Sequence, residues 1–123
     1  YAGVALKFIE IAQIGTKGTM IMCIPNNGSI DGLRNDDVVE ITCDVDKNGC
    51  TPHRIGKADE QNLELIRRVK NYERLSSKAI RERSRSAAIQ ALTLHPLVNS
   101  YSIAVKLVDE FIEHNKNYCG GWK

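Results

Sequence analysis

The 123-residue sequence lacks a long apolar run, a strong excess of charge of either sign, and any familiar cysteine motif. No stretch approaches the roughly 20 apolar residues of a membrane-spanning helix, so neither a transmembrane segment nor a signal peptide is predicted. A formal net charge of +2 is too small to indicate nucleic acid as a partner. With 26% charged and 42% apolar residues, the composition is typical of a soluble globular domain. We expect one domain over residues 1–123, with no membrane and no nucleic acid among its partners.

The four cysteines are too far apart for a metal or redox motif. Cys23, Cys43, Cys50 and Cys119 match the spacing of no zinc finger, zinc ribbon or Cys-x-x-Cys pair. A zinc site built from Cys43, Cys50 and His53 is disfavoured, because the last two alone approach ligand spacing. A domain of this size can build a core without disulfides, so we interpret the cysteines as free thiols in a reducing cytoplasm.

The first quarter of the chain predicts a helix followed by a strand. Apolar residues three and four apart predict a largely buried helix over residues 4–14, which Gly15 and Gly18 end. Residues 19–24 form a short apolar run between Gly and Pro. A run this short favours a buried strand over a helix.

A second strand is predicted by strict alternation over residues 37–46, where one face is apolar and the other polar. The apolar face consists of Val39, Ile41, Cys43 and Val45. Residues 46–49 are turn formers, which predicts a return through residues 50–56 as a shorter edge strand. An edge position tolerates Pro52.

The second half of the chain predicts three helices and a loop at the end. The first runs from Asp59, its expected cap, to about residue 83, and breaks around residues 84–86. A second helix begins at residue 87 and ends before Pro96, because a residue that precedes proline avoids the helical region.

The last helix is expected to be capped by Asn99 or Ser100. Its apolar stripe consists of Ile103, Ala104, Leu107, Val108, Phe111 and Ile112. One helix, two or three antiparallel strands and three helices define an α+β fold, a small antiparallel sheet packed with helices.

Few side chains in this sequence are arranged for chemistry. No Ser, His and Asp set and no glycine-rich phosphate loop is visible. His95 and His114 are interpreted as structural or solvated. Lys78, Arg81 and Arg85 are expected along one helical face, as a solvated surface or a phosphate-binding stripe. The residues alone therefore predict an α+β domain without a self-contained active site.

The order of several short motifs is more informative than any one of them. Together they resemble the C-terminal region of glycoside hydrolase family 4, within it most of all the 6-phospho-beta-glucosidases. The expected fold resembles the C-terminal domain of lactate dehydrogenase-like and family 4 glycosidase proteins. The motifs are "YAGVALKFIEI", "IPNNGSIDGLRNDDVVEITCDVDKNGCTPHRIG", "ERLSSKAI" and "ALTLHPLVNSYSIAVKLVDEF". The resemblance extends over essentially the whole chain.

The resemblance implies an unusual glycosidase that uses NAD and a divalent metal, typically manganese. Such enzymes oxidise the sugar at C3, which makes the proton at C2 acidic, eliminate the aglycone, add water and return the hydride. The metal polarises the developing enolate and the cofactor carries the hydride.

The resemblance also implies that the catalytic equipment lies before residue 1. The Rossmann half, the Cys and His metal ligands and the catalytic tyrosine are all expected upstream, and Tyr1 matches the tyrosine that opens the following helix. The chain is therefore expected to be a C-terminal, substrate-side fragment that is inactive alone. It is expected to hold no catalytic, cofactor-binding or metal-binding residue of its own.

Three departures from the family pattern mark this chain. Cys23 stands where relatives usually carry Asn, Arg34 stands where they carry Pro, and residues 82–85 replace a Gly-Asp turn. The first puts a polar pocket contact at that position in doubt, and the second loosens the loop.

Asn26 and Asn27 are the candidate substrate-binding residues. Their amides suit sugar hydroxyls, and long loops on a rigid scaffold commonly carry binding groups. The alternative is that both asparagines only satisfy turn backbone.

The expected substrate is a phosphorylated disaccharide, a 6-phospho-beta-glucoside, with the alpha linkage left open. A cytoplasmic homo-oligomer is expected. The rival hypothesis is a non-catalytic oligomerisation domain, since helices rich in Leu, Ile and Val often form interfaces. A small nucleic-acid binder is a third, disfavoured hypothesis, which would show steep salt dependence.

Overall fold

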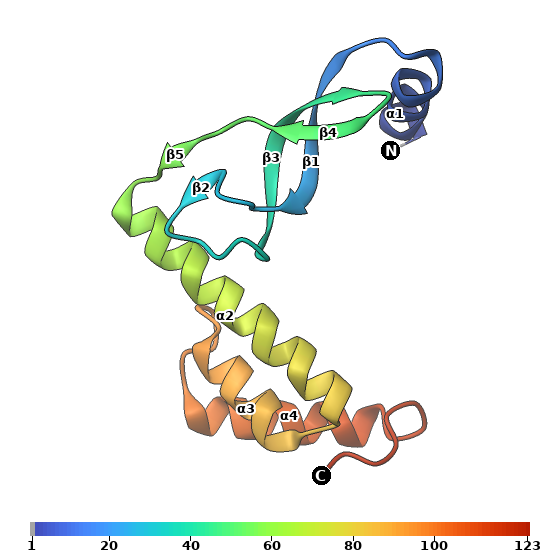
Figure 1. Ribbon diagram of the computed structural model, residues 1–123. Helices are drawn as coiled ribbons and strands as arrows, with labels where there is room; N and C mark the ends of the chain where they lie inside the picture. The colour runs from blue at the N-terminus through green and yellow to red at the C-terminus, as the bar shows by residue number, and fades with distance from the viewer. Residues whose placement is uncertain (1) are drawn as a thin grey trace. The chain divides into compact units, whose positions relative to one another are not determined.

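The computed structural model describes residues 2–123, which form four helices and five strands (Figure 1). Tyr1 and the role that the resemblance gives it lie outside the described residues. The chain divides into two compact units, an N-terminal unit (Tyr1–Ala58) and a C-terminal unit (Asp59–Lys123). No helix in the described part is both long and apolar enough to cross a membrane. The predicted α+β class is confirmed.

The N-terminal unit contains a three-stranded antiparallel sheet in the order β1-β3-β4. Its strands are β1 (Gly18–Pro25), β3 (Val38–Asp46) and β4 (Gly49–Pro52). All three predicted strands are thereby confirmed, and Pro52 ends the edge strand, where a missing N–H is tolerated.

A second, parallel pair joins β2 (Ile30–Asp31) to β5 (Gly56–Lys57). Neither of these strands was predicted, because two residues are too few to show a period.

The core of the N-terminal unit lies on one face of the sheet. Its buried residues are Ile11, Met20, Val39, Ile41, Cys43 and Val45. The alternation predicted for β3 is confirmed, since every second residue from Val39 to Val45 is buried. The expectation of a buried strand over residues 19–24 holds for one face of β1 only. Met20 is buried but Ile21 is 65% exposed, because the core of this unit lies on the Met20 side of the strand.

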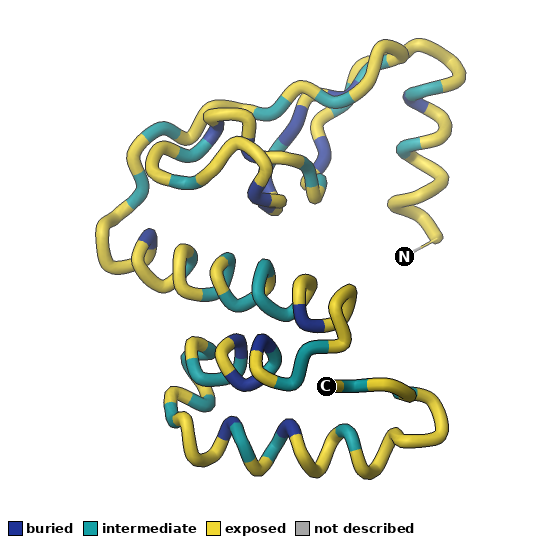
Figure 2. Tube along the Cα trace, turned by 60° about the horizontal axis from the view of Figure 1, so that its bottom comes forward, coloured by how far each residue is buried: buried dark blue, intermediate teal, exposed yellow. Residues whose placement is uncertain are grey.

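The first helix is α1 (Ala2–Ile14), which confirms the predicted position but not the predicted burial. Of its residues, Ile11 alone is buried. The other large aliphatic side chains are between 54% and 69% exposed, as the mostly exposed colouring of this helix in Figure 2 shows. Within its unit α1 packs against β3, through one side of the helix, so periodicity correctly predicted an apolar helix but not what covers it.

The C-terminal unit consists of α2 (Glu60–Glu82), α3 (Arg85–Leu94) and α4 (Tyr101–His114). Each helix begins at a polar cap whose side-chain oxygen accepts a backbone N–H. The caps are Asp59, which accepts from Gln61 and Asn62, Ser84, which accepts from Ala87, and Ser100, which accepts from Ile103. The predicted cap at Asp59, the break after residue 83 and the helix end before Pro96 are confirmed.

The C-terminal loop is fixed to the connection between α2 and α3. The Arg85 N–H donates to the carbonyl of Lys123, and the Lys123 N–H donates to the carbonyl of Arg83. Arg83 itself has a φ of 50°, the left-handed conformation that ends a helix without glycine here.

The predicted basic stripe is wrong in one member, because Arg85 opens α3 and does not continue α2. Its Nε and Nη2 donate to the two carboxylate oxygens of Asp109, at 2.6 and 2.8 Å. This bidentate pair joins α3 to α4, and the hydrogen bond from the guanidinium lowers the pKa of Asp109 below its ordinary value of 3.8.

Replacement of Val45 by alanine should destabilise the N-terminal unit by about 2 kcal/mol, because it leaves a cavity in the core. Urea unfolding followed through the amide signals of β1 and β3 measures this. Glu40→Ala, on the exposed face of the same strand, is the matched control and should change stability by less than about 0.5 kcal/mol. Equal effects of the two substitutions would contradict the assignment of faces.

Asp109→Asn should lower the thermal midpoint of the C-terminal unit at pH 7 by about 1–3 °C. Since folding lowers the pKa of Asp109, the stabilisation is present above the unfolded pKa and is lost as the pH falls through the folded value. The difference between wild type and variant should therefore shrink as the pH falls below the ordinary carboxyl pKa of 3.8. Fluorescence of Trp122, the single tryptophan, reports the transition. A difference that stays constant as the pH falls would contradict this origin, and Glu110→Gln is the control.

Candidate functional site at the asparagine corner

The loop between β1 and β3 begins with a tight turn. Asn27 and Gly28 both have positive φ, 43° and 83°, and the Ser29 N–H donates to the carbonyl of Asn26 at 2.8 Å. Two successive positive φ values closed by such a bond are the pattern of a type I′ turn, for which Asn-Gly is the preferred pair. Asn27 thus has a conformational reason to be asparagine.

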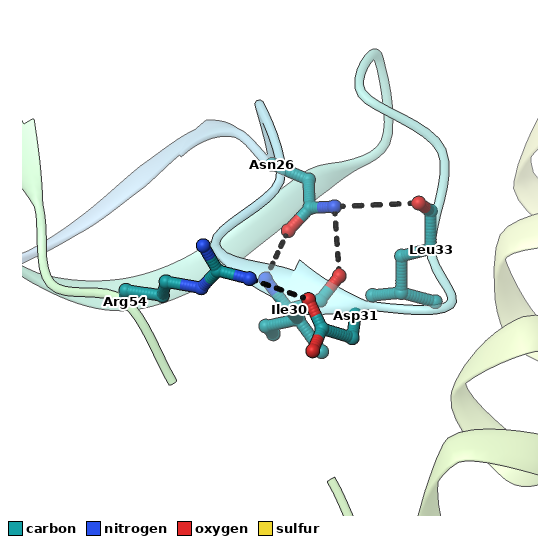
Figure 3. A network of polar contacts seen from close by, with 5 residues as sticks. All are labelled: Asn26, Ile30, Asp31, Leu33 and Arg54. Carbon is teal, nitrogen blue, oxygen red and sulfur yellow. Dashed lines mark hydrogen bonds and ion pairs between the residues drawn. The ribbon is translucent and has the colours of Figure 1, made fainter. Parts of the chain in front are cut away.

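The side chain of Asn26 holds the rest of the corner in shape (Figure 3). It is 0% exposed. Its Oδ1 accepts the Ile30 N–H at 2.8 Å, and its Nδ2 donates to the carbonyls of Ile30 at 3.1 Å and Leu33 at 3.5 Å. Both backbone groups of Ile30 are therefore bonded to one side chain, much as a neighbouring strand would bond them. This geometry gives Asn26 a structural role, and its contact with substrate stays a prediction.

Further backbone bonds close the base of the loop. The Asn26 N–H donates to the carbonyl of Asp37 at 2.7 Å, and the Asn27 N–H to that of Asn35 at 3.0 Å. The buried Asp37 carboxylate accepts the Arg34 N–H at 2.9 Å. Residues 26–37 therefore form a pinned loop even though Arg34 replaces the proline of the family pattern.

The corner is also tied to residues that are far away in the sequence. The buried Ser29 offers its carbonyl to the N–H groups of Ile55 and Gly56, at 2.9 and 3.0 Å. Arg54 pairs with Asp31 at 3.4 Å, and both side chains are largely exposed, at 76% and 49%. Such a pair contributes little stability, but it places a guanidinium beside the corner. Nothing in the local sequence indicated Arg54, because the parallel pairing of β2 with β5 brings it there.

The arrangement can bind but shows no catalytic pair of its own. Asn27 and Gly28 are exposed, and a Cβ on Gly28 would contact nothing within 4 Å. An amide, open backbone and the nearby Arg54 are groups that suit a polyhydroxylated or phosphorylated ligand.

His53, proposed with Cys43 and Cys50 as a disfavoured zinc set, pairs with a different residue. Its Nε2 lies 2.9 Å from Asp44 Oδ1, and the hydrogen bond lowers the pKa of that carboxyl. All four cysteines are free, and burial raises the pKa of the Cys43 thiol. Within residues 2–123, no three His, Cys, Asp or Glu side chains group as metal ligands.

The other two histidines lie in the C-terminal unit, and neither belongs to a group of metal ligands within residues 2–123. His95 packs edge-on against Tyr72, with ring centroids 4.5 Å apart, and its Nδ1 accepts the Leu97 N–H. The structural interpretation of His95 therefore has a geometric basis. His114 lies exposed in the last turn of α4.

The C-terminal unit also has an apolar groove of about 300 Å³ that the sequence did not indicate. Ala79, Ala91, Phe111 and Trp122 are among the residues that line it. Its lining suits packing or apolar contact, not acid-base chemistry.

Comparison with known proteins assigns the family. Residues 2–98 match the family described as the family 4 glycosyl hydrolase C-terminal domain. The chain therefore belongs to glycosyl hydrolase family 4, and the resemblance seen in its motifs is confirmed.

The similar curated proteins are phosphoglucosidases. The chain is 41% identical over 118 residues to the 6-phospho-beta-glucosidase BglT of Thermotoga maritima, covering 96% of this chain and 28% of that protein. It is 37% identical to the maltose-6′-phosphate glucosidase MalH of Clostridium acetobutylicum, covering 96% and 27%. The chain thus spans little more than a quarter of the length of these relatives.

Solved structures of such enzymes have the same fold over this region. The 6-phospho-beta-glucosidase of Thermotoga maritima, solved with manganese, NAD⁺ and glucose-6-phosphate, matches with a TM-score of 0.87 and 35% identity, over 96% of this chain and 30% of that one. A 6-phospho-alpha-glucosidase from gut microorganisms, solved with NAD and glucose-6-phosphate, matches with a TM-score of 0.90 and 32% identity, over 98% and 27%.

Asn26→Ala should destabilise the N-terminal unit by about 2–3 kcal/mol, because it leaves the N–H and C=O of Ile30 without their partner in a partly buried loop. Urea unfolding measures the change. Asn27→Gly is the matched control, since glycine accepts the same positive φ, and should change stability by less than about 1 kcal/mol. Equal losses in both variants would contradict the separate roles of the two asparagines.

Proposed function

We propose that this chain is the C-terminal, substrate-side part of an NAD- and divalent-metal-dependent 6-phospho-glycosidase. The observation that carries the proposal is the match of residues 2–98 to the C-terminal domain of family 4, in relatives named as phosphoglucosidases. In this proposal residues 1–123 act as one domain of the larger enzyme.

The described residues do not fit a metal ion of their own, because no three metal-ligating side chains among them form a cluster. A solved relative that is more than three times longer contains NAD⁺ and manganese. We propose that both bind to polypeptide outside residues 1–123, and that this chain alone is inactive.

The asparagine corner is the surface that we propose for substrate contact. Asn26 fixes the loop through its buried amide, and Asn27 presents its amide to solvent next to the open backbone of Gly28. Hydrogen-bond donors on a pinned loop lose little entropy when a sugar binds. We favour substrate contact by Asn27 over contact by Asn26, because the Asn26 amide already makes three hydrogen bonds within the loop.

A β-linked 6-phosphoglucoside is the substrate that we propose, supported by 41% identity to a 6-phospho-beta-glucosidase, which exceeds the 37% identity to a maltose-6′-phosphate glucosidase, whose substrate is α-linked. We propose a cytoplasmic location, which four free thiols support. A role in homo-oligomer assembly is the second candidate, favoured by large aliphatic side chains exposed on α1 and elsewhere.

The longer polypeptide that the gene encodes should hydrolyse 4-nitrophenyl 6-phospho-β-glucoside, with both NAD and Mn²⁺ required. Residues 1–123 alone should release no nitrophenol. In the longer polypeptide, Asn27→Gly, which keeps the positive φ of the turn, should raise KM about 5- to 10-fold, because one hydrogen bond to the substrate is lost. Asn48→Ala, at the turn between β3 and β4, is the control.

Hydrolysis of the α-linked substrate alone would overturn the proposed linkage. Turnover by residues 1–123 would overturn the assignment of catalysis to the rest of the protein. An Asn27→Gly variant with wild-type KM and kcat would remove the corner from the substrate site.

A further inference from the structure

The inner side of α1 is covered by its own unit over residues 8–12, whereas Val4, on the same side nearer the start of the helix, is 61% exposed. Ile11 is buried in the core of the sheet, and Phe8 packs partly buried against that core. Ala12, one residue further, is half-buried. These three residues define the inner face of the helix.

The opposite side of α1 is mostly apolar and is exposed. At 100° per residue, Ala2, Leu6 and Ile9 lie on the side away from Ile11, with Gln13 as the one polar residue among them. Leu6 is 65% exposed and Ile9 54%. We call Ala2, Leu6 and Ile9 the outer face.

Between the two faces runs a narrow polar strip, formed by Lys7 and Glu10, the two charged residues of the helix. A helix with one polar strip and apolar residues on two opposite sides is typical of a layer buried between two others. A 13-residue helix is marginal without tertiary packing, so exposure of one whole apolar side leaves it poorly supported.

We propose that the outer face of α1 docks against the polypeptide that precedes residue 1 in the full-length protein. The inference rests on the proposed function. The family match is to a C-terminal domain, and the relatives are more than three times as long as this chain, so most of their length lies outside the match. Helix α1 is the first element of the matched region and so lies next to that missing length.

The size of the outer face favours a partner within the same polypeptide. A helix of 13 residues is about 20 Å long, so one side of it offers far less than the roughly 800 Å² per partner of a stable dimer. A covalently joined partner needs no such area, because the linkage raises its effective concentration to the millimolar range. A small apolar face is therefore sufficient between two parts of one chain.

The test compares thermal unfolding of the longer polypeptide with and without NAD. If the outer face couples the two parts, the wild type should unfold in one transition that NAD raises as a whole. Leu6→Glu combined with Ile9→Glu should split it into two transitions, of which NAD raises one. Lys7→Glu, on the polar strip, is the matched control and should keep a single transition.

A milder double variant, Leu6→Ala with Ile9→Ala, is less prone to misfold. It should also separate the two unfolding transitions, with a smaller difference between their midpoints. Hydrogen exchange gives a second readout that does not depend on NAD. The amides of residues 2–14 should exchange at least about 10-fold more slowly in the longer polypeptide than in residues 1–123 alone.

The outcomes separate the two proposals. A wild type that NAD does not stabilise overturns the proposed function, and the exchange rates then still decide the inference. A single NAD-raised transition in the double glutamate variant overturns the inference alone. The inference is also overturned if the amides of α1 exchange at the same rate in both polypeptides. That result would mean that residues 1–123 themselves cover the outer face. Dimerisation of residues 1–123 that the glutamates abolish would assign the face to a second copy and overturn the inference.

Discussion

The N-terminal unit depends on one buried amide. Asn26 takes the place of a neighbouring strand for Ile30, since it accepts that residue's N–H and donates to its carbonyl. This fixes the direction in which the chain leaves the Asn-Gly turn, and β2 can then pair with β5. A buried amide that lost these bonds would be costly, so the loop has one well-defined shape. The exposed groups of the corner, Asn27 and Arg54, are positioned by this shape.

The C-terminal unit is organised by contacts at the ends of its helices. Ser84 and Ser100 begin α3 and α4, and the left-handed Arg83 ends α2. The backbone of Lys123 is bonded to this same connection, and Arg85 joins α3 to α4 through Asp109. Because α3 packs against both other helices, these contacts set how the apolar faces of all three meet. The apolar groove is a consequence of that arrangement, since small alanines of α3 contribute to its lining.

Membership of glycosyl hydrolase family 4 gives the two units a common context. The family shares a region of this length within enzymes that are more than three times longer. The described chain has a polar corner that hydrogen bonds hold in shape, and it has exposed apolar surfaces. No cluster of metal ligands is found within residues 2–123.

The sequence by itself determined the features that depend on near neighbours. The helices, the alternating β3, the Asp59 cap and the break after Arg83 follow from residues within a few positions of one another. The family follows from the order of several short motifs along the chain. The tertiary structure decided which polar groups meet and which apolar faces are covered. Asn26 could be interpreted as a ligand or a turn residue until its burial was known, Arg54 gave no signal at all, and the predicted burial of α1 was wrong. The physical reason is that periodicity shows that a face is apolar, whereas burial and pairing depend on residues brought together from distant positions.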